Sequence, residues 1–273
     1  MTREEEIETV TADTDSFASE GRDVREAAEE FDGRILDAIK EKTPVEIFEL
    51  IHTHNPLLRW DLVKFVDTYR ESGIYQEDRL KPVFYHLMDL KLMLYFVSEV
   101  DLGLSNAIYY LPLHQAGMQS PSPLLTLRKL SIDHSIIGKS RVAWERLMNA
   151  IYHLEFGRDL DRSTPKRKSK KSFFFDAIQE APKWVWLEPY RKVVSDYDEK
   201  FRTSEFHKSS ILRGEFLGTR KIDLNELLTL VNYLNNNIWD NLISIVAGDN
   251  AIRFTDLHML PDGSGINSRY MPQ

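Results

Sequence analysis

The chain has 273 residues, of which 42% are hydrophobic and 11% aromatic, and its formal net charge at pH 7 is −8. It contains no cysteine, which excludes disulfides, thiolate zinc sites, cysteine-ligated iron–sulfur clusters and cysteine nucleophiles. No run approaches the ~18 consecutive apolar residues of a membrane-spanning helix, and the acidic amino terminus lacks the apolar region of a secretory signal. These features predict a cytoplasmic protein without a membrane segment.

The negative charge is concentrated at the amino terminus. Residues 1–30 hold eleven acids and three bases, which leaves 32 residues of each sign in the rest of the chain. Low hydrophobicity combined with like charge predicts that residues 1–21 form a disordered acidic tail. Such a tail is typical of a solubilising segment; the functional alternative is a docking tail or a mimic of nucleic acid.

Helical spacing of apolar residues begins after this tail and predicts a helix over 22–42. A capping box at residues 43–46 then begins a short helix that ends near residue 51. His52 and His54 follow it, but two histidines two residues apart diverge on a helix and no third ligand has a suitable spacing. We therefore predict no metal site and no cofactor.

The next two predicted helices span 57–71 and 81–100, the second with Pro82 in its first turn. The second helix is apolar nearly all round, which is typical of a central core helix. It carries His86 and Asp89 one turn apart, either as a satisfied core polar pair or as an acid/base couple. Glycines and prolines in residues 103–121 predict an irregular connection.

The longest helix is predicted over residues 122–157. Pro123 is suited to its first turn, and Gly157 is suited to the position just past its end. Six large apolar residues on it recur at helical spacing and predict one buried stripe: Leu130, Ile137, Trp144, Leu147, Ile151 and Leu154. We therefore expect the other helices to pack around this one.

A strongly basic segment follows the long helix. Five bases lie within residues 166–171, directly before three phenylalanines: Lys166, Arg167, Lys168, Lys170 and Lys171. A basic run beside aromatic residues can bind the phosphates and stack the bases of a nucleic acid. The same composition is also typical of a solvated loop between helices, here residues 158–172, or of a nuclear import signal.

The remaining pattern is helical as well. Pro189 marks the first turn of a helix that runs to Phe201, and the polar stretch 201–218 predicts a loop or a short helix. A second capping box begins a helix over 223–248, and residues 249–273 predict an irregular tail. The sequence thus predicts an all-α multi-helix bundle, with one domain over 22–248 that is divisible at the basic segment.

Several common sites are absent from the sequence: it has no P-loop, no GxGxxG after a strand, no HExxH and no nucleophile elbow. One positive pattern lies on the long helix, where Arg146, Asn149 and His153, with Lys139 near the same line, share the side opposite Trp144. An arginine, an asparagine and a histidine in line can hold a phosphate and transfer a proton. A solvated helix face is the alternative.

This pattern resembles the HEPN family of helical bundles, in which an arginine is followed by a histidine after four to six residues. Arg146 and His153 have six residues between them, and Arg202 and His207 have four. The family favours a polar residue directly after the arginine; Thr203 satisfies this after Arg202, whereas Leu147 follows Arg146. The resemblance implies a metal-independent ribonuclease that acts as a homodimer, in which the arginine steadies a phosphate and the histidine transfers protons.

Two functions are therefore expected from the sequence. The first is a helical binding protein that contacts RNA or an acidic protein through the basic segment. The second is a HEPN-like ribonuclease, in a bacterial toxin or phage-defence setting. A structural subunit whose long helix pairs with a copy of itself is a third interpretation, and the sequence alone does not decide whether the protein is an enzyme.

Overall fold

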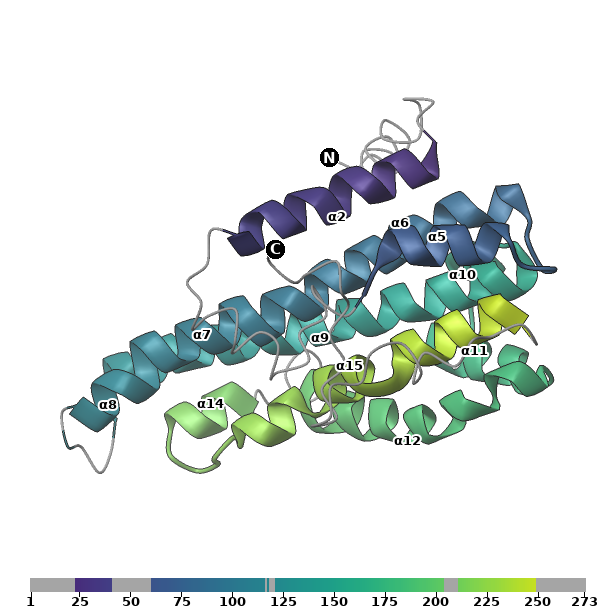
Figure 1. Cartoon of the computed structure of the whole chain (residues 1–273). Coiled ribbons are helices and arrows are strands. Elements are labelled where there is room, and N and C mark those ends of the chain that lie inside the picture. The colour runs from purple at the N-terminus through teal and green to yellow at the C-terminus, as the bar shows by residue number, and fades with distance from the viewer. Residues whose placement is uncertain (1–22, 41–59, 116, 118–120, 204–210, 249–273) are drawn as a thin grey trace, which may run out of the picture.

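The computed structural model describes residues 23–40, 60–115, 117, 121–203 and 211–248 (Figure 1). These residues form helices joined by short turns, with no strand among them, which confirms the predicted all-α architecture. The acidic tail, the helix predicted near residue 45, His52, His54 and the carboxy-terminal tail lie outside the described residues. None of the described helices is long and apolar enough to cross a membrane.

The central helix is α9, Pro123–Phe156, and both of its ends agree with the prediction. The Ser122 side chain accepts a hydrogen bond from the Leu125 backbone N–H and so caps the first turn. At the other end Gly157 adopts the left-handed conformation with φ of 63°, and its N–H donates to the His153 carbonyl at 2.9 Å.

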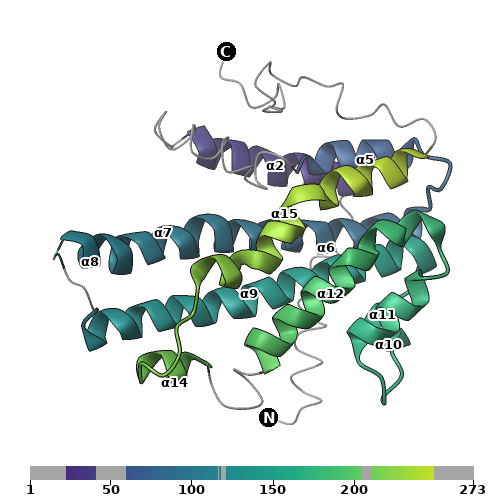
Figure 2. The same ribbon diagram turned by 90° about the horizontal axis from the view of Figure 1, so that it is seen from below.

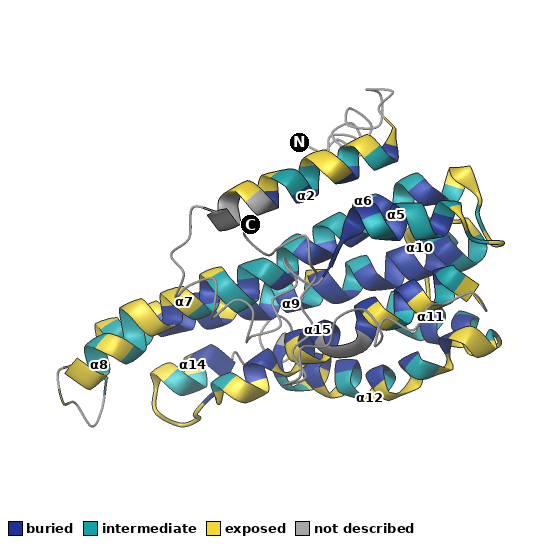
Figure 3. Ribbon diagram, in the orientation of Figure 1, coloured by how far each residue is buried: buried dark blue, intermediate teal, exposed yellow. Residues whose placement is uncertain are grey.

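The predicted apolar stripe of α9 is buried along its whole length. Trp144 lies at its middle, fully buried, with its ring stacked on Phe175 at 5.8 Å and edge-on to Phe174 at 6.1 Å between centroids. Burial of this kind is what makes a helix of this length stable, because helix propensity alone contributes little. Figure 3 shows buried residues along α9 and on the helices next to it.

Helix α6, Glu77–Tyr95, is the main partner of α9 and runs antiparallel to it (Figure 2). It begins earlier than predicted, with Glu77 and Asp78 in the first turn, where acidic residues interact favourably with the helix dipole. Pro82 therefore lies inside the helix and not in its first turn.

The predicted irregular connection over 103–121 is wrong for most of its length. The helical path of α6 continues through the π-helical segment η1 (Phe96–Asp101), α7 (Leu102–Ser105), the π-helical segment η2 (Asn106–Tyr110) and α8 (Leu111–Gln115). A glycine such as Gly103 destabilises a helix by only about 1 kcal/mol. Packing of η1, α7 and η2 along α9 outweighs this local preference.

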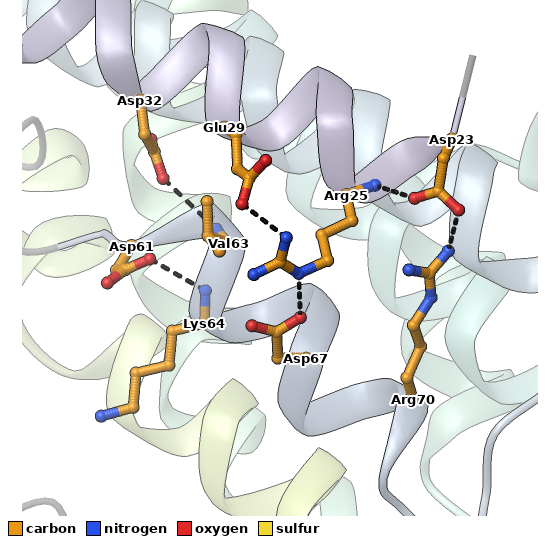
Figure 4. Close-up of polar contacts among 9 residues, drawn as sticks. All are labelled: Asp23, Arg25, Glu29, Asp32, Asp61, Val63, Lys64, Asp67 and Arg70. Carbon is orange, nitrogen blue, oxygen red and sulfur yellow. Dashed lines mark hydrogen bonds and ion pairs between the residues drawn. The ribbon is translucent and has the colours of Figure 1, made fainter.

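Helices α2 (Val24–Lys40) and α5 (Leu62–Arg70) cover α6, and charged side chains join them (Figure 4). The Arg25 Nε donates to Asp67 at 2.8 Å, and Arg70 donates to Asp23 at 2.8 Å. Helix α5 begins at Leu62 and not at residue 57, because the Asp61 side chain caps it by accepting from the Lys64 N–H at 2.8 Å.

The segment after α9 contains more helix than predicted. Asp159 and Ser169 act as N-caps for α10 (Leu160–Ser163) and α11 (Lys170–Ile178), so the loop between them holds only residues 164–169. The 3₁₀ segment η3 (Pro182–Leu187), α12 (Glu188–Tyr197) and the π-helical segment η4 (Asp198–Thr203) follow. The helix predicted to begin at Pro189 is thus confirmed.

Two helices complete the described chain. The short α14 (Ile211–Phe216) lies in the stretch predicted as a loop or a short helix, and α15 (Leu224–Ala247) is the predicted last helix. The Asp223 side chain caps α15 by accepting from the Asn225 N–H, and Gly248 ends it. Helix α15 packs against α9, α5 and α12, and buried apolar residues on both sides of the basic segment belong to one core.

Candidate functional site

Arg146 and His153 lie on the side of α9 that faces α6, so this side is not a solvated helix face. The Arg146 Nε pairs with the Asp89 carboxylate of α6 at 3.1 Å, and both side chains are 38% exposed. The His153 ring lies 5.7 Å from the His86 ring of α6, and its side chain is 13% exposed. The structure therefore adds His86 and Asp89 to the residues predicted from α9.

The electrostatics of this group leave both imidazoles neutral at pH 7. Burial, reinforced by nearby Arg146 and His153, lowers the pKa of His86 from 6.5 to about 4. Burial also lowers the pKa of His153, against the opposing effect of Asp159 at 4.0 Å. A neutral histidine beside an arginine can accept a proton, and the arginine can hold an anion if it leaves Asp89.

The other predicted members of this site are placed differently. Asn149 is buried, and Lys139 pairs with Asp101 at 2.9 Å instead of joining Arg146. Arg202 lies in η4, but its side chain and the whole of His207 are outside the described residues. Of the predicted catalytic residues, only Arg146 and His153 therefore lie in one group, together with His86 and Asp89 of α6.

The basic segment is less positive than its sequence indicates. Lys168 pairs with Asp176 at 2.6 Å, Lys170 pairs with Asp161, and Lys171 pairs with Asp198 at 3.0 Å. Within the described part of the chain, Lys166 and Arg167 make no ion pair. Local neutralisation of three of the five bases weakens the simple picture of a basic loop that attracts phosphates without a defined site.

Two of these lysines instead line a pocket between α9, the start of α11, the end of α12 and the start of η4. The pocket has a volume of about 490 Å³, and every residue that lines it is charged or carries a hydroxyl: Arg141, Glu145, Ser169, Lys170, Lys171, Ser195, Asp198 and Glu199. A wall without apolar side chains suits a polar ligand and disfavours an apolar one.

Sequence reasoning identified only Lys170 and Lys171 of this pocket; it missed Arg141 because the spacing of Arg141 to Glu145 indicates only a pair within α9. The structure confirms that pair at 2.6 Å and adds a weaker contact to Asp198 at 3.8 Å. The Arg141 Nε and Nη1 are buried and have no hydrogen-bond acceptor among the described residues, and the Asp198 Oδ1 likewise has no donor. These three atoms are buried beside the pocket and do not open onto it.

Comparisons of the chain with protein-family models, with curated proteins and with solved structures find no match. The resemblance to the HEPN family accordingly depends on the spacing of arginine and histidine in the sequence. The two groups of side chains described above are therefore the basis for assigning a function.

Proposed function

We propose that the protein binds RNA at the pocket of Arg141, Lys170 and Lys171. The observation that carries the proposal is that these three cations line a single polar pocket, where a phosphate would replace the carboxylates that now pair with them. Arg141 lies on α9, and Lys170 and Lys171 are the first two residues of α11. Ser169 is the N-cap of α11. Guanidinium, ammonium and helix amino-terminal groups are the donors that proteins use for phosphate.

The acidic residues of the pocket support RNA over a simple anion. Glu145, Asp198 and Glu199 would repel an isolated phosphate, but each can accept a hydrogen bond from a sugar hydroxyl. Every nucleotide of RNA offers a 2′-hydroxyl as such a donor, and DNA lacks it. A ribose phosphate therefore matches both the cations and the carboxylates of the wall.

The first test measures binding of a short single-stranded RNA, and of DNA of the same sequence, by fluorescence polarisation. We expect Lys170→Gln/Lys171→Gln to weaken RNA binding by about tenfold or more. The slope of log K against log salt should become shallower by about 0.7 for each phosphate that the variant no longer neutralises. DNA should bind more weakly than RNA, because it cannot donate to the carboxylates.

The matched control is Lys166→Gln/Arg167→Gln, which removes the same charge from the loop outside the pocket. It should change RNA binding less than the pocket variant does. Because Lys171 also pairs with Asp198, the thermal midpoint is recorded for each variant, and Lys171→Arg should keep both fold and binding. Equal losses in the two double variants, or no RNA binding by the parent protein, would refute the pocket.

A second function, ribonuclease activity, is favoured by one specific observation. His86 lies beside His153 and Arg146, which puts two imidazoles and a guanidinium in one partly exposed group. A neutral imidazole can accept the proton of the 2′-hydroxyl as that oxygen attacks the neighbouring phosphate, and the imidazolium so formed can give a proton to the 5′-oxygen that leaves. This is also the activity that the HEPN resemblance implies.

We expect the purified protein, if it has this activity, to cut RNA in the presence of EDTA, to leave DNA intact and to yield cyclic phosphate ends. His153→Ala should reduce cleavage by about 10²–10⁴-fold, the usual contribution of general acid/base catalysis. Burial lowers the pKa of His153 below 6.5, and protonation of His153 would remove its function as a base. The kcat/KM of the parent protein should therefore decrease with a midpoint below pH 6.5. His134→Ala, an exposed histidine on the same helix, is the control.

His207→Ala separates the two predicted motifs. If it abolishes cleavage while His153→Ala cuts like the parent, the activity belongs to the motif of Arg202 and His207, and the assignment to α9 is wrong. If the parent protein leaves RNA intact in a confirmed dimer, the ribonuclease proposal fails. RNA binding at the pocket is measured separately and is unaffected by either result.

A further inference from the structure

A buried cluster of three charged side chains joins α14 to the first half of α9. The Lys129 Nζ donates to the Asp133 Oδ2 at 2.5 Å and to the Glu215 Oε1 at 2.9 Å. The side chains of Lys129 and Asp133 are 5% and 1% exposed, and that of Glu215 is 12% exposed. One ammonium group therefore faces two carboxylates away from water, and the cluster carries one excess negative charge when both carboxylates are ionised.

The two carboxylates also have more acceptor atoms than the surrounding donors supply. The Asp133 Oδ1 and the Glu215 Oε2 are buried, and neither accepts a hydrogen bond from a described residue. A carboxylate oxygen that is ionised and buried without a donor is unfavourable. A single bound proton corrects both defects, because it removes the excess charge and turns one of the carboxylate oxygens into a hydroxyl donor.

Asp133 is the residue of the cluster that is best placed to take this proton, because its side chain is the more deeply buried of the two acids. Burial raises the pKa of Asp133 above its usual value of 3.8. The charge of Lys129 opposes this effect, and the charge of Glu215 adds to it. The cluster thus favours the neutral form of Asp133 more than water does.

The other ionisable groups that interact with Asp133 are phenols. They belong to Tyr109 and Tyr110 of η2 and to Tyr197 of α12, and burial raises the pKa of each above 10. Burial opposes the charge of Lys129, but the two carboxylates outweigh burial and hold its pKa above 10.5. Within the described part of the chain, the phenols are therefore neutral and Lys129 is charged wherever a carboxyl group titrates.

We propose that the cluster of Lys129, Asp133 and Glu215 binds a proton, and that the bound proton strengthens the attachment of α14 to α9. When Asp133 is ionised, it competes with Glu215 for Lys129 and repels the Glu215 carboxylate. When Asp133 is protonated, Lys129 and Glu215 form a balanced ion pair between the two helices. Falling pH thus holds α14 more firmly, and rising pH loosens it.

The proposal goes beyond RNA binding and does not depend on it, because the cluster and the pocket share no residue. The pH dependence of stability is measured on the full chain and needs no ligand. Failure of RNA binding and failure of this proposal are consequently separate results.

The first measurement is the thermal midpoint of the full chain from about pH 4 to pH 8, for the parent protein and for Asp133→Asn. The pKa of Asp133 is higher in the folded chain than in the unfolded chain, so its contribution to stability falls as the pH rises from about 3.8 through the raised pKa. Asparagine is neutral and brings an amide donor, so the variant lacks this fall. We expect the variant to melt about 2–4 °C above the parent at the upper end of this range, and the difference to shrink toward pH 4.

A second measurement, hydrogen exchange followed by mass spectrometry, locates the effect on α14. The amides of residues 217–219 report on this helix, because they donate to its backbone carbonyls. Asp133→Asn and Glu215→Gln each remove one carboxylate from the cluster, but only Asp133→Asn keeps the ion pair between Lys129 and Glu215. Near neutral pH these amides should exchange about threefold or more slower than the parent in Asp133→Asn, and faster than the parent in Glu215→Gln.

The matched control is Glu226→Gln, which removes a carboxylate from an exposed ion pair with Lys200. It should change neither the exchange of residues 217–219 nor the way the thermal midpoint depends on pH. An Asp133→Asn variant whose midpoint equals or lies below that of the parent at the upper end of the pH range would overturn the proposal. Faster exchange of residues 217–219 in Asp133→Asn would overturn it as well.

Discussion

Trp144→Ala should lower the free energy of unfolding by about 3–5 kcal/mol, the usual result of truncating a buried tryptophan to alanine. Trp144 is fully buried at the middle of α9 and packs against Phe174 and Phe175 of α11. Its indole N–H has no hydrogen-bond partner among the described residues, so the loss comes from packing and the cavity that remains.

Urea denaturation measures this effect as a shift of the midpoint with an unchanged slope. Val142→Ala, at an exposed position of the same helix, should change the free energy of unfolding by less than about 0.5 kcal/mol. A loss below about 1 kcal/mol for Trp144→Ala would mean that α9 does not anchor the core.

Asp32→Ala should have an effect of similar size, about 3–5 kcal/mol, because it leaves a buried charge without its partner. Lys91 is fully buried, and its Nζ donates to the Asp32 Oδ1 at 2.9 Å and to the Trp60 carbonyl at 2.6 Å. The Asp32 Oδ2 accepts from the backbone N–H groups of Leu62 at 2.9 Å and Val63 at 3.3 Å. Removal of Asp32 therefore leaves the buried Lys91 ammonium without a carboxylate partner. It also leaves the first N–H groups of α5 without this acceptor.

Lys91→Met is the comparison variant and should destabilise less than Asp32→Ala. It removes one buried charge, and Asp32 keeps the two backbone donors that stabilise its carboxylate. Denaturation of both variants by urea provides the test. A larger loss for Lys91→Met would contradict the role of Asp32 as the acceptor for the first backbone N–H groups of α5.

The effect of Asp32→Ala should also depend on pH. Burial already lowers the pKa of Lys91 below 10.5, and loss of the nearby carboxylate removes the main effect that raises it. The unfolded variant then binds a proton that the folded variant has released, so stability rises with pH up to about 10.5. The deficit relative to the parent protein should accordingly shrink as the pH increases.

The sequence determined the features that depend on neighbours within a few residues. Helix α9 begins after Ser122 and ends before Gly157, and α15 begins after Asp223 and ends before Gly248. Caps of this kind act on backbone groups one turn away. The apolar stripe through Trp144 is likewise a local pattern, since helical spacing fixes which side chains share a side. These predictions needed no knowledge of what the stripe packs against.

The tertiary structure decided what covers each side of these helices. The helical path from α6 to Gln115 persists through Gly103 because α9 supports it, and Arg146 and His153 face α6 and are only partly exposed to solvent. Arg141 joins Lys171 and Asp198 in one pocket although they are far apart in the sequence. Spacing along one helix shows which residues lie together on it, but only packing between helices brings residues of different segments into one site.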